Sequence, residues 1–60
     1  MEAYQERVVL EKKELDEKIN KLSVFVSSDT LKEDVANVLK KQLAIMIDYS
    51  NILSERISNF

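Results

Sequence analysis

The stretch VANVLKKQLAIMIDYSNILSERISNF, residues 35–60, decides the fold, because apolar side chains recur in it every three or four residues. That spacing predicts an amphipathic α-helix. The apolar arc covers about half of the helix surface, which is wider than the contact with one partner helix requires. We therefore expect part of the arc to face another subunit. The apolar members of the arc are Val35, Val38, Leu39, Ile45, Met46, Ile52, Leu53 and Ile57.

Three polar side chains, Gln42, Tyr49 and Arg56, run in a line down the middle of this arc. They are spaced seven residues apart, so on a helix they stack along one face. One interpretation is a polar seam, since polar residues in an apolar helical contact fix register and subunit number at a cost in stability. The other interpretation is a ligand pocket between subunits. The pattern leaves both open.

The apolar spacing in residues 2–26 predicts a first helix. Its apolar stripe is narrower than the arc of residues 35–60. Its outer side is rich in Glu and Lys, as expected for a solvated helix face. Tyr4 extends the stripe by one turn toward the N-terminus, and Lys12 lies close to it. The stripe consists of Val8, Leu15, Ile19, Leu22 and Val26.

The turn-like cluster of the chain is Ser-Ser-Asp-Thr, residues 27–30. Its composition predicts the loop that connects the two helices. Thr30 and Glu33 have the spacing of a capping box, which predicts a second helix over about residues 31–58. The expected fold is all-α: one domain, residues 1–60, forming an antiparallel two-helix hairpin that assembles into a homo-oligomeric helical bundle. Pairing about the loop centre would place Lys12 near Met46 and Tyr4 near Leu53.

The composition excludes several classes of function. The sixty residues contain no Cys, His, Gly or Pro, so thiolate sites, His-based catalysis and Gly-rich phosphate loops are excluded. Nine basic against eleven acidic residues argue against a nucleic-acid polymer as partner. No segment is apolar enough for a signal peptide or a membrane span, which indicates a soluble, intracellular protein. We expect no enzyme, metal site or cofactor, and no plausible base lies beside Ser27, Ser28 or Ser50 in the sequence.

Two runs of the sequence resemble a known family. The first is Tyr4-Gln-Glu-Arg7-Val8 with Glu11–Leu22, and the second is Gln42-Leu43, Met46, Tyr49-Ser50, Leu53 and Arg56-Ile57. Together they resemble a family of small helical-hairpin proteins of tailed bacteriophages, named after a crAss-like phage gene product. The resemblance implies a phage accessory protein. In architecture alone the chain is similar to phage sponges that sequester cyclic nucleotide signals, as anti-CBASS and anti-Thoeris proteins do.

The leading functional hypothesis is a non-enzymatic phage counter-defence protein in the host bacterial cytoplasm, which sequesters a cyclic nucleotide immune signal at subunit interfaces. Aromatic rings would stack on a base and cationic side chains would hold phosphate. The alternative is a small oligomeric protein–protein interaction module without a small ligand, with Leu10, Val24 and Ile47 as its exposed contacts. The predicted ligand-binding residues are Tyr4, Arg7, Lys12, Gln42, Tyr49 and Arg56.

Overall fold

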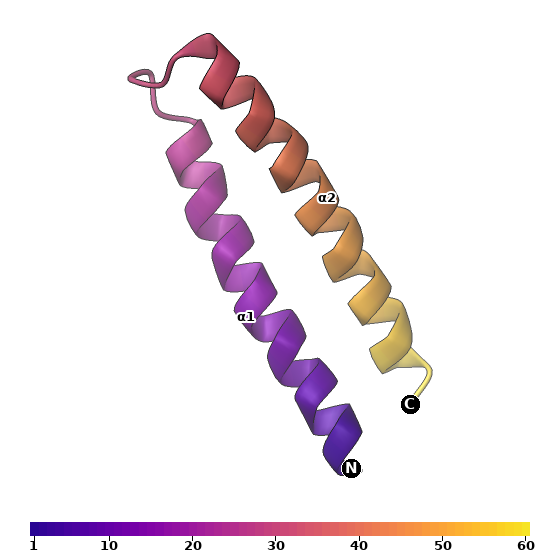
Figure 1. The fold of residues 1–60 in the computed structure, drawn as a ribbon. Coiled ribbons are helices and arrows are strands. Elements are labelled where there is room, and N and C mark those ends of the chain that lie inside the picture. The colour runs from indigo at the N-terminus through magenta and orange to yellow at the C-terminus, as the bar shows by residue number, and fades with distance from the viewer.

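The computed structural model describes residues 1–60 as two α-helices joined by a short loop (Figure 1). Helix α1 spans Ala3–Val26 and helix α2 spans Glu33–Ser58. They lie side by side and antiparallel, giving a rod of 45 × 14 × 12 Å (Figure 1). The predicted all-α two-helix hairpin is confirmed.

The start of α1 is fixed by a side chain one turn into the helix. The backbone N–H of Glu2 donates a hydrogen bond of 2.8 Å to Oε1 of Gln5. The first N–H groups of a helix have no partner within the helix, and such a bond satisfies one of them. Glu6 adds negative charge in the first turn, where it interacts favourably with the positive end of the helix dipole.

The start of α2 differs from the sequence prediction. Lys32 is the N-cap and makes no side-chain capping bond, so the capping box expected from Thr30 was wrong. The hydroxyls of Ser28 and Thr30 instead hydrogen-bond each other at 2.8 Å, and the Thr30 N–H donates to Ser28 Oγ at 3.3 Å. Local bonds of this kind compete with helix formation. The connection therefore extends over residues 27–32.

The contact between the helices follows a three-four repeat on both of them. On α1 most of the buried or half-buried side chains form the facing stripe: Gln5, Val8, Lys12, Leu15, Ile19, Leu22 and Val26. On α2 they form the inner stripe: Ala36, Leu39, Leu43, Met46, Ser50, Leu53 and Ile57. This spacing is the heptad pattern of helices that cross at a small angle. Leu53 is fully buried and marks the centre of the core.

The two helices are offset by about one helical turn from a pairing centred on the loop. Lys12 contacts Ser50 rather than Met46, and the ring of Tyr4 lies against Phe60 at the end of α2. Figure 1 shows this offset, since α2 begins beyond the end of α1 and the loop rises to reach it. The start of α2 consequently extends past the end of α1 (Figure 1). The expected register was wrong because the connection is longer than four residues.

Candidate ligand-binding face

The wide apolar arc of α2 resolves into two parallel stripes offset by one residue. The inner stripe packs on α1. The second, which we call the outer stripe, has the same heptad spacing but no partner within the chain. Val38, Ile45 and Ile52 on it expose 63%, 69% and 54% of their surface. The outer stripe consists of Val35, Val38, Gln42, Ile45, Tyr49, Ile52 and Arg56.

Gln42, Tyr49 and Arg56 thus lie on an open surface and not in the core of the hairpin. Tyr49 remains 42% exposed. Gln42 makes one contact, from its Nε2 to the sulfur of Met46 at 3.8 Å. The three side chains are therefore available to a ligand or to a second subunit.

Tyr4 and Arg7 lie on the same side of the hairpin as the outer stripe. Each of them immediately precedes a facing-stripe residue of α1, just as each outer-stripe residue precedes one of the inner stripe. In an antiparallel helix pair, residues that precede the contact positions of both helices share one side of the pair. Five of the six predicted ligand-binding residues therefore share a face, and four of these five lie in the half of the hairpin away from the loop: Tyr4, Arg7, Tyr49 and Arg56.

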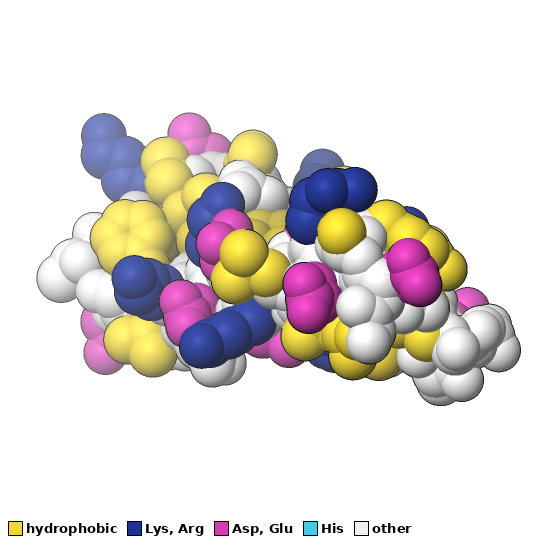
Figure 2. Space-filling model, turned by 90° about the horizontal axis from the view of Figure 1, so that it is seen from below, with side chains coloured by type: hydrophobic (Ala, Val, Ile, Leu, Met, Phe, Trp, Pro, Cys, Tyr) yellow, Lys and Arg dark blue, Asp and Glu magenta, His cyan; other side chains and the backbone are white.

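An aromatic pair closes the open end of this face. The rings of Tyr4 and Phe60 meet edge to face, with centroids 5.9 Å apart and planes at 77°. Both rings are largely exposed, at 53% and 43%. In such a pair the rings keep exposed faces, and nucleobases stack on aromatic ring faces. Figure 2, which views the molecule from below in the orientation of Figure 1, shows apolar side chains open to solvent among charged ones.

The cations on this face have no acidic partner within the chain. The salt bridge between Lys12 and Asp16 is the only one in the structure. Arg7 and Arg56 are exposed and outside it. A guanidinium without a carboxylate partner retains all five N–H donors for a phosphate or for an acidic group of another molecule.

Lys12 points to the other side of the hairpin, into a polar cluster that the sequence did not predict. Its Nζ donates to Asp16 Oδ2 and to Ser50 Oγ, both at 2.8 Å, and Ser50 Oγ donates to Asp16 Oδ1 at 2.5 Å. Ser50 is buried at 6% exposure. The expectation that Ser50 lacks a partner was wrong. A polar residue at an inner-stripe position was the sequence signal for this cluster, together with the four-residue spacing of Lys12 and Asp16.

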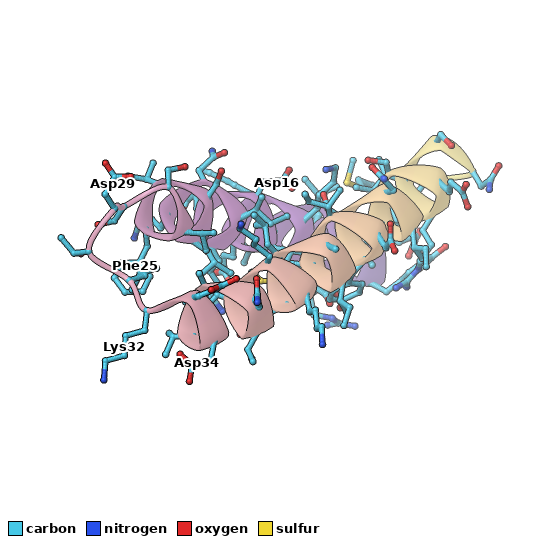
Figure 3. All side chains as sticks on the ribbon, turned by 90° about the horizontal axis from the view of Figure 1, so that it is seen from above. Asp16, Phe25, Asp29, Lys32 and Asp34 are labelled. Carbon is cyan, nitrogen blue, oxygen red and sulfur yellow. The ribbon has the colours of Figure 1, made fainter.

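The cluster is electrostatically satisfied. Hydrogen bonds from Lys12 and then from Ser50 lower the pKa of the Asp16 carboxyl from its ordinary value of 3.8, and desolvation acts in the opposite direction without reversing the shift. A carboxylate with a lowered pKa is a poorer base toward the hydroxyl. Figure 3 shows Asp16 on α1, well away from the loop residues Asp29 and Lys32. The geometry is that of an interhelical brace.

The chain has one surface hollow, and it lies elsewhere. A shallow depression of about 330 Å³ near the start of α2 is lined by Asp34, Val35, Val38 and Leu39. None of the six predicted residues lines it. No group of three acidic side chains is placed to hold a metal ion. Neither helix combines the length and the apolar character needed to span a bilayer.

A comparison with known protein families gives one assignment. Residues 2–59 match the family Sequestin. The chain belongs to the Sequestin family. No curated protein and no solved structure matches the chain. For this Sequestin-family chain, the match covers both helices, the loop and all six predicted ligand-binding residues, and the family name is consistent with a sequestering role.

Proposed function

We propose that this Sequestin-family chain is a phage-encoded, non-enzymatic counter-defence protein. It acts in the cytoplasm of the host bacterium, where it binds and sequesters a cyclic nucleotide immune signal between subunits. The observation that carries the proposal is the shared face on which exposed aromatic, amide and cationic side chains of both helices lie. A Sequestin-family match over nearly the whole chain supports a sequestering role.

The chemistry of this face suits a nucleotide with phosphodiester groups. Arg7 and Arg56 have free guanidinium donors for phosphate oxygens. Tyr49, or the Tyr4–Phe60 pair, presents a ring face to a base, and Gln42 has an amide for a base edge. Lys12 is already bound by Asp16 and Ser50, so its part in the proposal is to hold the two helices in place.

A single hairpin offers these groups on a convex rod, and its only hollow lies outside them. Ligand sites in proteins are concave and bury most of the ligand surface. The proposal therefore places the ligand between two copies of the chain, where facing surfaces supply the missing wall.

Native mass spectrometry of the protein purified from defence-active cells tests the proposal. We expect a discrete oligomer that carries a few hundred daltons of extractable nucleotide for each site. Isothermal titration with the extracted compound then gives its affinity. An oligomer with nothing bound, and with no heat from a panel of cyclic mono- and dinucleotides, contradicts the proposal.

Two substitutions and one control localise the site. Arg56→Ala should weaken binding by at least about tenfold, equivalent to about 1.4 kcal/mol, because it removes a charged phosphate donor. Tyr49→Phe should weaken binding too, because it removes the hydroxyl from the site, while both variants keep the oligomer. Lys40→Ala is the matched control, since Lys40 is an exposed cation on the opposite flank of α2. Loss of the oligomer in either variant would instead support a polar seam.

A second candidate function rests on a different surface. This surface lies away from the helix contact and from the outer stripe. It contains Leu10 and Val24 on α1 and Ile47 on α2, which are 54%, 75% and 43% exposed. Isolated exposed aliphatics are common, but a partner protein would use residues of this kind. In that case the chain is an oligomeric interaction module that inhibits a host or phage protein. Its signature is a co-purifying protein that Val24→Glu releases and Arg56→Ala retains.

A further inference from the structure

We infer that a second copy of this chain docks on the outer stripe of α2, its own α2 running antiparallel, so that two hairpins form a twofold-symmetric four-helix bundle. The inference deepens the proposed function, which places the ligand between subunits. It is argued without any ligand, and its test needs none.

The solvent-accessible surface area of the chain is larger than that of a compact protein of its mass, which indicates that one face is buried in an assembly. A compact protein of 7.0 kDa exposes roughly 4,000 Å². This chain exposes 4752 Å², and three of its sixty residues are buried. Its radius of gyration is 14.1 Å, against about 10 Å for a compact domain of this length. The excess of about 700 Å² is close to the roughly 800 Å² that each partner buries in a standard interface.

The offset between the two stripes matches the geometry of a four-helix bundle. Successive residues on an α-helix are rotated by about 100°. The outer stripe precedes the inner stripe by one residue at every position, so it faces about 100° away from α1. In a square bundle each helix has two neighbours at roughly a right angle. The inner stripe of α2 therefore faces α1, and the outer stripe faces the second neighbour.

The heptad spacing of the outer stripe identifies that neighbour as a helix, and its composition favours α2 of the second copy. The same side of α1 carries Glu11, Glu14, Lys18 and Lys21 along its middle. Packing the apolar outer stripe against those charges would bury them without compensation. Packing it against the same stripe of another α2 covers its aliphatic side chains and brings Gln42 and Tyr49 to the contact. The one charge in the stripe, Arg56, lies at its end, where the guanidinium reaches solvent.

The charges also fit a twofold arrangement. On α1, two acidic residues, Glu11 and Glu14, are followed by two basic ones, Lys18 and Lys21. An antiparallel second copy brings the acidic pair of each α1 toward the basic pair of the other. On the flank of the outer stripe, heptad alignment of two antiparallel α2 helices brings Lys41 of each copy beside Glu55 of the other. Asp48 lies near the axis, so the two Asp48 carboxylates approach each other and their repulsion lowers the affinity.

Sedimentation equilibrium without ligand tests the inference. We expect the wild type to sediment at twice its 7.0 kDa mass at micromolar concentration. Ile45→Glu should raise the dimer dissociation constant by at least about 100-fold, because it places a charge in the centre of the apolar contact. Val24→Glu is the control, since Val24 is similarly exposed, at 75% against 69%, but lies on the far side of α1. A monomeric wild type at every concentration, or dissociation by Val24→Glu alone, overturns the inference.

Charge-reversal variants at Lys41 and Glu55 provide a second test in case Ile45→Glu unfolds the chain. Lys41→Glu and Glu55→Lys should each weaken the dimer, by about threefold or more, by placing like charges together. The double variant should restore it. Residues 41 and 55 lie four turns apart on one helix, so they cannot pair within a chain. Equal weakening in the single and double variants would rule out the antiparallel α2 pairing. A wild-type dimer that binds none of the cyclic nucleotides would contradict the proposed function and leave this inference standing.

Discussion

The hydroxyl of Ser50 on α2 donates a hydrogen bond of 2.5 Å to Oδ1 of Asp16 on α1. Lys12 binds both of them, which places a closed set of three polar side chains against the core beside the fully buried Leu53. Apolar contacts along a heptad seam allow a helix to slide by a heptad with little loss, whereas a polar group must find its own partner. We interpret the cluster as the feature that fixes the offset between α1 and α2.

Ser50→Ala should lower the free energy of unfolding by about 1–2 kcal/mol, because the buried bonds from Lys12 and to Asp16 are lost together. A chain of this size has only a few kcal/mol in total, so the urea midpoint should fall clearly. Circular dichroism during urea titration measures the change. Ser54→Ala, at an exposed position one turn further along α2, is the control. If both variants unfold at the same urea concentration, Ser50 does not brace the helices.

The lowered pKa of Asp16 predicts a loss of stability in acid. The carboxyl titrates at lower pH in the folded chain than in the unfolded chain, so its contribution is fully present above the unfolded pKa of about 4. That contribution is lost as the pH falls through the folded pKa. The difference in unfolding free energy between wild type and Asp16→Asn should therefore be constant above about pH 5 and shrink below about pH 4.

Urea titrations at a series of pH values measure this difference. Subtracting the variant from the wild type cancels the contributions of the other carboxylates. Glu17→Gln, which alters an exposed neighbouring acid, provides the comparison. A difference between wild type and Asp16→Asn that stays flat down to pH 2 would show that the Asp16 carboxylate is not engaged in solution.

The edge-to-face contact of Tyr4 and Phe60 predicts a small coupling between the two ends of the chain. A double-mutant cycle with Tyr4→Ala and Phe60→Ala should give a coupling of about 0.5 kcal/mol, the lower limit for aromatic pairs, because both rings are half exposed. Upfield ring-current shifts of Tyr4 protons that disappear in Phe60→Ala provide a direct check. Additive effects in the cycle would mean that the rings do not meet.

The hairpin and the contact face of α1 follow directly from the sequence. Val8, Leu15, Ile19, Leu22 and Val26 were predicted as the stripe of α1, and all five are buried or half-buried against α2. A stripe flanked by charged residues has one orientation that buries it, so the period alone determines the face.

The contact face of α2 did not follow in the same way. Two apolar heptad stripes one residue apart merge into a single wide arc in the sequence. The width of the arc does not determine whether its inner or its outer stripe faces α1. The choice depends on the offset between the helices, which depends on a loop whose length was underestimated at Thr30. The candidate site inherits this uncertainty, because Gln42, Tyr49 and Arg56 become open surface only once the other edge is buried.

Leu53 and Ile52 are neighbours in sequence, yet the structure assigns them to different contacts. Leu53 is fully buried on the inner stripe, and Ile52 is 54% exposed on the outer stripe. Leu53→Ala should cost about 2–5 kcal/mol and abolish helical structure, because it opens a cavity in a core that holds only a few kcal/mol. Ile52→Ala should leave the helix content intact at high protein concentration and reduce self-association. Circular dichroism and sedimentation over a concentration series separate the two effects. The assignment of the stripes is wrong if Ile52→Ala unfolds the concentrated protein as fully as Leu53→Ala does, because Ile52 would then contribute to the core of the hairpin as Leu53 does.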